Sequence, residues 1–278
     1  MSADELFKAG RLREAIEAQT LEVKAHPAET AKRLFLFELL AFEGDLGRAR
    51  KQVDALHFDQ PELQAAVLTY QGLLDAETRR RELFEAGSPP PKFLTDPPAH
   101  VLLRLEAVAR LQAGDSAAAA VLLAKANADV PSFRGSLNGQ PFELLRDVDD
   151  LFGTVIEVMA RGSYFWVPLE QVERLTMGAP RFPRDLLWIP ARLELAAASG
   201  DVFVSALYPS THTDSDELVQ LGRKTDWRGD EEAPTLGYGL RTFLMGDDPI
   251  GILEWRELIV ETETETEGEP GPVTQPEG

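Results

Sequence analysis

The sequence contains no cysteine among its 278 residues, which excludes disulfides, cysteine-ligated zinc, cysteine-ligated iron–sulfur clusters and thiol nucleophiles. Long apolar runs are absent too, since no segment approaches the roughly 18 uninterrupted apolar residues that a membrane-spanning helix needs. The N-terminal stretch MSADELFKAGRLREAIEAQ lacks the apolar core of a secretory signal peptide. These absences predict a cytoplasmic protein without membrane insertion.

Basic residues are scarce: 28 Lys and Arg stand against 47 Asp and Glu, a formal net charge of −19. Such acidity argues against binding nucleic acid or anionic lipid through a basic face. Residues 1–140 carry a net charge of −3, residues 141–260 of −10, and residues 261–278, which include six Glu, of −6. The three zones predict one domain over 1–140, a second over 141–260, and a disordered acidic tail over 261–278.

The first zone contains an internal repeat. Three copies share a Gly, an Ala five residues later and a Pro 17 residues after the Gly: Gly10, Ala15, Pro27; Gly44, Ala49, Pro61; Gly114, Ala119, Pro131. The first two copies are 34 residues apart, which is the period of the tetratricopeptide (TPR) helix pair, and the third follows the second by 70 residues. The Gly would mark the turn and the Pro would stop the second helix. The pattern predicts TPR-like helical repeats, with a degenerate middle repeat over 62–86.

Stacked helix pairs form a curved solenoid with a concave surface that suits a peptide or a helix. On the TPR register, the inward positions of the second and third copies predict a partner-binding groove lined by Ala31, Leu34, Glu38, Ala41, Val101, Arg104, Val108 and Leu111. The apolar members would supply contact area, and Glu38 and Arg104 would set the register. The alternative is that these apolar residues pack between the protein's own helices.

Beyond Pro131, Pro and Gly separate short apolar runs rich in aromatic and branched residues, which is typical of strands. We expect strands at 154–159, 163–167, 186–195, 202–208, 240–245 and 251–260, a hairpin turn at Gly162, a helical turn at 168–172, and sheet edges or bulges at Pro168 and Pro190. The predicted fold class is therefore α+β, with N-terminal TPR-like helical repeats followed by a small strand-rich domain shaped as a curved sheet or barrel.

The chain has no motif of a known catalytic or metal centre, because G-x-S-x-G, H-E-x-x-H and the Walker lysine are all missing. His212 lies near Asp214 and Asp216 but without the Gly and Glu of a calcium loop, so a solvated loop or a helix N-cap is the favoured interpretation. Gly237-Tyr238-Gly239 begins a dinucleotide fingerprint that Thr242 breaks. We expect no cofactor, no metal and no catalysis, and an enzyme site around His212 and acidic residues of the second zone is the third hypothesis.

Four strings in the second zone are distinctive: YFWVPLEQVE at 164–173, DLLWIPAR at 185–192, ALYP at 206–209 and KTDW at 224–227. With them the chain resembles the ImpE family, also called TagJ, of type VI secretion accessory proteins, over residues 1 to about 260. The resemblance implies a non-enzymatic cytoplasmic accessory protein. Some members bind the N-terminal helical segment of the small sheath subunit, which associates them with sheath recycling by the ClpV ATPase.

The leading hypothesis is thus an adaptor whose helical half binds a helical segment of the small sheath subunit, with ClpV as an indirect partner. The alternative from the structural class is a self-associating scaffold module whose groove is filled by its own chain. Neither hypothesis involves nucleic acid or insertion into a membrane.

Overall fold

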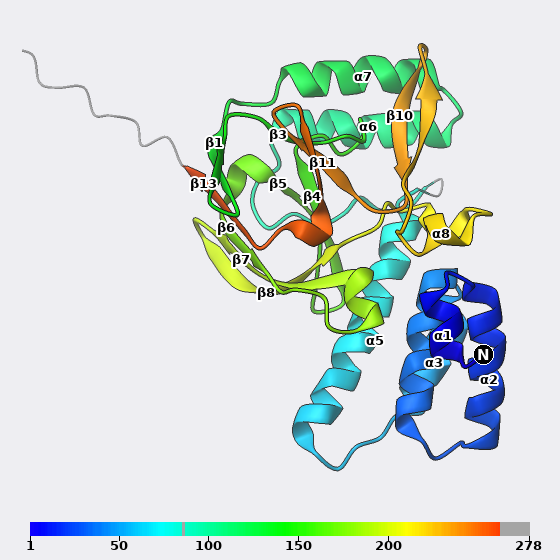
Figure 1. Cartoon of the computed structure of the whole chain (residues 1–278). Coiled ribbons are helices and arrows are strands. Elements are labelled where there is room, and N and C mark those ends of the chain that lie inside the picture. Colours follow the sequence, from blue (N-terminus) through cyan, green and yellow to red (C-terminus); the bar gives the residue numbers. More distant parts are fainter. Residues whose placement is uncertain (85–86, 262–278) are drawn as a thin grey trace, which may run out of the picture.

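The computed structural model describes residues 1–84 and 87–261. Helices come first in the chain and a strand-rich part follows (Figure 1), so the predicted α+β class is confirmed. The predicted disordered tail over 261–278 lies, apart from Glu261, outside the described residues. Among the described residues, none of the helices combines the length and the apolar character needed to cross a membrane.

Among the residues that the structure describes, seven helices precede the first strand: α1 (Ala3–Lys8), α2 (Leu12–Ala25), α3 (Thr30–Glu43), α4 (Leu46–Asp54), α5 (Pro61–Glu82), α6 (Ala99–Gln112) and α7 (Ser116–Ala128). The repeat glycines end α1, α3 and α6 with φ values of +80° at Gly10, +91° at Gly44 and +76° at Gly114, a conformation that favours residues without a Cβ. The predicted turns are therefore confirmed. The prediction of a degenerate middle repeat over 62–86 was wrong, because residues 61–82 form one long helix and not a pair of helices.

The helices pack in two groups. Helices α1 to α5 share an apolar core that includes Leu12, Phe37 and Leu40, whereas α6 and α7 pack as a pair on a separate core with Phe152 and Trp166. Helix α5 lies between the groups and contacts β4 and β5 of the strand-rich part. In Figure 1 the first helices project at the lower right, away from α6 and α7. A continuous TPR-like solenoid is therefore not confirmed.

The strand-rich part is built on an eight-stranded antiparallel sheet with the order β2-β1-β13-β6-β7-β8-β4-β5. Its strands are β1 (Arg134–Leu137), β2 (Gln140–Phe142), β4 (Val155–Ala160), β5 (Ser163–Pro168), β6 (Val172–Met177), β7 (Trp188–Leu195), β8 (Ala198–Ser205) and β13 (Glu257–Glu261). Strands β3 (Leu145–Asp147), β11 (Thr242–Met245) and β12 (Asp248–Gly251) form a second sheet, and β9 (Asp226–Asp230) and β10 (Ala233–Tyr238) form a ribbon beside α7.

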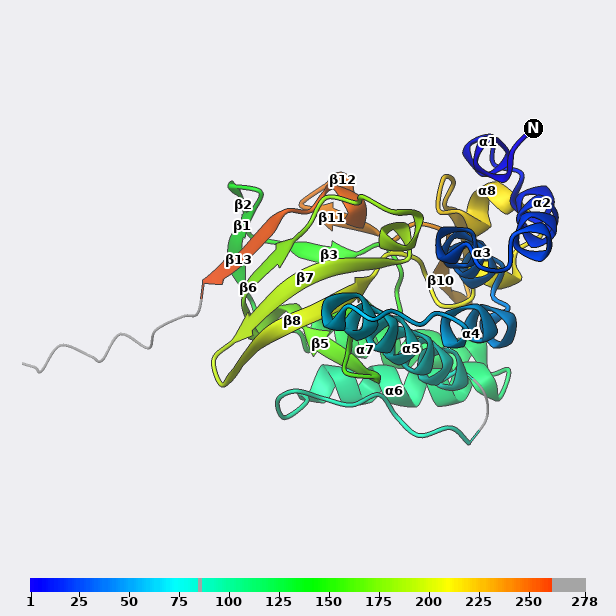
Figure 2. The same ribbon diagram turned by 90° about the horizontal axis from the view of Figure 1, so that it is seen from below.

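Short helical segments connect the strands: η1 (Leu169–Gln171), η2 (Pro183–Leu186), η3 (Thr211–Thr213), α8 (Glu217–Gln220) and η4 (Ile252–Glu254). Figure 2 shows α5 against the sheet beside β5 and β8, with α1, α2 and α8 at the end of the molecule opposite β1 and β2. The long helix α5 is thus the element that joins the first helices to the sheet.

Local strand signals were accurate where a turn fixed the pairing. Strands β4 and β5 pair across Arg161-Gly162, which confirms the hairpin, and η1 confirms the helical turn. The single strand expected at 251–260 was wrong, because η4 interrupts it. The edge position expected for Pro190 was wrong, because Pro190 lies in the interior strand β7. Proline is tolerated there because the pairing of β7 with β6 ends beside it, and the last hydrogen bond on that side is donated by Gly178 N–H to the Pro190 carbonyl.

The two halves of the chain share a core. Met159, Trp188, Leu207 and Leu221 from the strand-rich part belong to the same apolar cluster as α1 to α5. The first strand begins at Arg134, inside the zone predicted to be helical. The domain boundary at residue 140 stays a prediction.

Candidate functional site

The eight residues predicted to line a groove lie in two separate places. Ala31, Leu34, Glu38 and Ala41 are on α3 among the first helices, and Val101, Arg104, Val108 and Leu111 are on α6. Because α3 and α6 belong to different apolar cores, the structure does not bring the two sets together. Ala31 is exposed, Leu34 and Leu111 are half-buried, and the other five are buried.

The two charged members of this set are held by other parts of the same chain. Arg184 Nη1 donates to Glu38 Oε1 at 2.5 Å. Arg104 donates to the carbonyl oxygens of Asp150 and Leu151 at 3.0 and 3.1 Å and to Asn127 Oδ1 at 2.6 Å. A partner would have to displace these contacts in order to reach the two side chains. Contact between the eight residues and a partner stays a prediction.

Glu38 makes stability depend on pH. Burial raises its pKa from 4.5 to about 7, because the cost of desolvating the carboxylate exceeds the attraction of Arg184. The folded state therefore binds a proton more tightly than the unfolded state, and this contribution to stability is full below pH 4.5 and is lost as the pH rises through about 7. We expect the free energy of unfolding to fall between about pH 5 and about pH 8 relative to Glu38→Gln, which cannot titrate. Urea denaturation at both pH values measures this; the same pH dependence in both proteins would contradict it.

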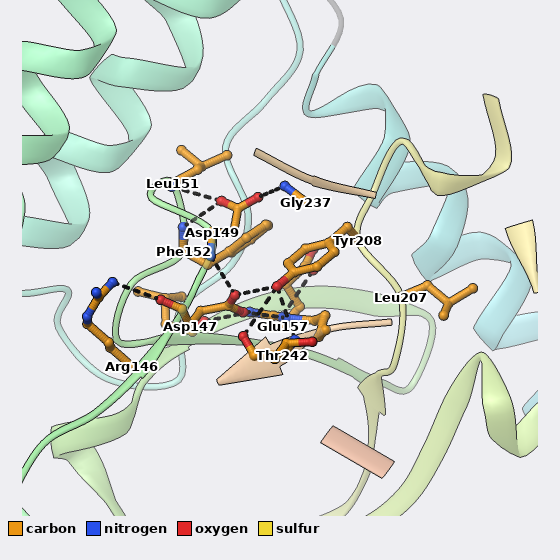
Figure 3. A network of polar contacts seen from close by, with 12 residues as sticks. Arg146, Asp147, Asp149, Leu151, Phe152, Glu157, Leu207, Tyr208, Gly237 and Thr242 are labelled. Carbon is orange, nitrogen blue, oxygen red and sulfur yellow. Dashed lines mark hydrogen bonds and ion pairs between the residues drawn. The ribbon is translucent and has the colours of Figure 1, made fainter. Parts of the chain in front are cut away.

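A cluster of charged side chains is buried where α5 meets β3, β4 and β11 (Figure 3). Arg241 pairs with Asp147 at 2.7 Å and with Glu157 at 3.2 Å. Arg80 of α5 pairs with the same Glu157, with Nε and Nη2 each 2.7 Å from a carboxylate oxygen. All four side chains are at most 4% exposed. We call these four residues the buried charge cluster.

Tyrosines and backbone groups complete the hydrogen bonding around this cluster. Tyr208 Oη donates to Asp147 Oδ1 at 2.6 Å, and Tyr164 Oη donates to Glu157 Oε1 at 2.5 Å. Asp149 lies beside them and accepts N–H groups of Leu151 and Gly237 (Figure 3); burial and the charge of Asp147 raise its pKa to about 8. A cavity beside Arg80 has a volume of about 20 Å³, and a second cavity beside Asp149 has a volume of about 170 Å³. The hydrogen bonds between Arg80 and Glu157 fasten α5 to the strands.

His212 does not join the acidic residues near it in sequence. Its ring packs on Gly44, where a Cβ would lie 2.6 Å from His212 Cδ2, and burial lowers its pKa to about 4. Asp214 pairs with Arg228, and Asp216 pairs with Lys224 at 3.2 Å. Within residues 1–84 and 87–261, no three His, Asp or Glu side chains are grouped so that they could hold a metal ion.

Two adjoining cavities lie along α5 and a third continues from the second, and we call the three together the α5 trough. The first, of about 450 Å³, lies between α5 and residues 178–185; the second, of about 590 Å³, between α5 and the β4–β5 turn; the third, of about 380 Å³, between that turn and the β7–β8 hairpin. The first and second share Thr69 and Phe203, and the second and third share Ala160, Arg161 and Asp201. Because neighbouring cavities share lining residues, the trough is a continuous surface of the kind that a chain segment can occupy.

Each cavity of the trough contains one exposed large apolar side chain. These are Phe182 in the first, Leu68 in the second and Leu94 in the third, which are 51%, 62% and 37% exposed. Exposed apolar residues beside a concave surface are typical of sites that bind proteins or ligands. Sequence reasoning missed this surface. The one signal in the sequence was Leu68. It is apolar, but it lies beside the stripe of α5 residues that is buried, which includes Val67 and Leu74.

Comparison with known proteins gives consistent results. Residues 139–259 match the family model described as ImpE protein. Over 262 residues the chain is 35% identical to the type VI secretion system accessory component TagJ of Pseudomonas aeruginosa, covering 94% of this chain and 92% of that protein. The crystal structure of protein VPA1032 from Vibrio parahaemolyticus matches with a TM-score of 0.85 at 21% identity, covering 94% of this chain and 98% of the other, and shows a shared fold.

Proposed function

The chain belongs to the ImpE family, also called TagJ, and on this premise we propose that it is a non-enzymatic adaptor of a type VI secretion system that binds a helical segment of the small sheath subunit. The observation that carries the proposal is the 35% identity, over 94% of the chain, to a protein named as an accessory component of that system. Through the sheath subunit the chain would be linked in the cytoplasm to sheath recycling by the ClpV ATPase.

The α5 trough is the surface that supports this function best. It follows α5 from residue 66 to residue 76, about 16 Å of helix at 1.5 Å per residue. An amphipathic helix laid beside it could place its apolar residues on Leu68 and Phe182, as in other complexes in which a helix occupies a groove. The eight residues predicted on α3 and α6 remain a second proposed surface, which would need the chain's own contacts to open.

Titration of the purified full-length chain with the small sheath subunit of the same secretion system tests the proposal. We expect a complex with the intact subunit, and none with a subunit that lacks its N-terminal helical segment. Failure of the intact subunit to bind, or equal binding of the shortened one, would contradict the proposed function.

A self-associating scaffold is the alternative, because a second copy of the chain could also cover the exposed apolar residues of the trough. Light scattering separates the two. The adaptor hypothesis expects the mass of one copy for the chain alone and a larger mass with the sheath subunit; the scaffold hypothesis expects an oligomer that the subunit does not change.

A further inference from the structure

The β4–β5 turn places an arginine in a backbone conformation that few residues with a side chain adopt. Arg161 has φ +48° and Gly162 has φ +73°, both left-handed, in a two-residue turn between Ala160 and Ser163. Such turns favour Asn-Gly, because the left-handed conformation brings Cβ close to the next carbonyl oxygen and the short polar side chain of Asn offsets this cost with local hydrogen bonds. Strained residues of this kind cluster at ligand-binding positions.

The side chain of Arg161 makes no hydrogen bond within residues 1–84 and 87–261. It is exposed and lines both the second and the third cavity of the α5 trough. In the part of the chain that the structure describes, its guanidinium forms no ion pair. Asn at position 161 would give a more stable turn. The Arg that stands there instead places an unpaired guanidinium in the trough.

A second free cation lies at the other end of the trough. Arg181 lines the first cavity and is exposed, and its guanidinium likewise has no ion pair within residues 1–84 and 87–261. Most other charges of the trough are engaged: Arg50 pairs with Asp75 at 3.0 Å, Arg184 pairs with Glu38 at 2.5 Å, and Asp185 accepts the backbone N–H groups of Arg181 and Phe182. The side chain of Asp201 is 90% exposed and lies 3.5 Å from Arg192.

We propose that the α5 trough selects a partner segment that combines an apolar face with carboxylates, and that Arg161 and Arg181 bind those carboxylates. A guanidinium suits this role because it can donate two parallel hydrogen bonds to one carboxylate. The chain has a net charge of −19, so an acidic segment is repelled by most of the surface and is accepted only where cations are free. That the partner segment is helical rests on the proposed function. The new inference is that the segment carries carboxylates and that Arg161 and Arg181 recognise them.

Two designed peptides of equal length and helix content test the assignment on the full-length chain. Both carry the same Leu face, and one has Glu and the other Lys at both flanks. We expect the wild type to prefer the Glu peptide by about fivefold or more, and Arg161→Asn with Arg181→Gln to weaken only the Glu peptide by about three- to tenfold. Arg110→Gln, an exposed change on α6 outside the trough, should leave the preference unchanged.

Arg161→Asn alone provides a readout that a structural role would not give. Because Asn suits the left-handed turn, we expect the melting temperature to rise by about 2 °C while affinity for the Glu peptide falls. A chain that ends at Glu261 should bind the Glu peptide at least as tightly as the full chain, and more tightly if the five Glu of residues 262–278 compete for the same cations. Weaker binding by the shortened chain would overturn the assignment of the cations to a partner.

Equal affinity for the Glu and Lys peptides, or an unchanged preference in the double variant, would also overturn the inference. Titration of the same variants with the small sheath subunit separates the two proposals. If the subunit does not bind the wild type but the peptide preference holds, the proposed function fails and the inference stands. If the subunit binds every variant equally and the peptides show no preference, only the inference fails.

Discussion

Replacement of Arg241 by Met is expected to lower the free energy of unfolding by about 3–5 kcal/mol. The side chain of Arg241 is fully buried, pairs with Asp147 and Glu157, and donates to the Val155 carbonyl at 3.0 Å. In the variant, Asp147 loses the one cation that pairs with it among the described residues, whereas Glu157 keeps Arg80. A buried carboxylate without a cation is costly, because the hydrogen bonds that Tyr208 and the Asp149 N–H still donate to Asp147 replace only part of the water that it lost on folding.

Urea denaturation of both proteins measures this loss. Arg110→Met is the matched control, since Arg110 forms an exposed pair with Glu106 at 3.5 Å and its removal should change stability by less than about 0.5 kcal/mol. Adding Asp147→Leu to Arg241→Met should recover part of the loss, because the buried charge is then removed with its partner. A loss below about 1 kcal/mol for the single variant would mean that the pairs of Arg241 with Asp147 and Glu157 contribute little to stability.

The buried charge cluster also marks where sequence reasoning stops. Gly10, Gly44 and Gly114 identified three turns correctly, because the need for a left-handed residue is local and does not depend on distant packing. The pairs of the cluster join residues 77 to 94 positions apart, and no local pattern signals them. Helix spacing likewise gave no signal for the segments that cover Glu38 and Arg104.

The strand-rich part was harder to predict for a similar reason. Strand β4 is apolar along most of its length and was found, whereas β9 is mostly exposed and polar and depends on β10 for its pairing. The α5 trough combines α5, two hairpins and the segment 178–185, so its cavities exist only after the chain has folded. Single residues such as Leu68 were visible in the sequence, but the surface to which they belong was not.

Contacts between the two halves also decide how binding should be measured. Arg80, Glu38 and Arg104 from the first 140 residues have their partners mainly in the second half. A fragment of residues 1–140 would leave these charges and the shared apolar core exposed to water. Binding experiments therefore need the full chain, and surface substitutions are the suitable way to separate the two proposed surfaces.

Leu68→Glu combined with Phe182→Glu is expected to weaken binding of the small sheath subunit by about 30-fold or more. Both side chains are largely exposed, so the change removes two apolar contact points of the trough while the core stays intact. Isothermal titration calorimetry on the full chain measures the affinity, and the melting temperature should stay within about 2 °C of the wild type.

Leu102→Glu combined with Val121→Glu is the matched control for that pair. These residues are 52% and 71% exposed on α6 and α7, outside the trough, so the variant carries the same added charge and should bind as the wild type does. Loss of binding in both double variants would point to added charge alone, since the chain is already acidic. Full binding by the trough variant would remove the α5 trough from the function, and the positions on α3 and α6 would then be the surface that a partner must open.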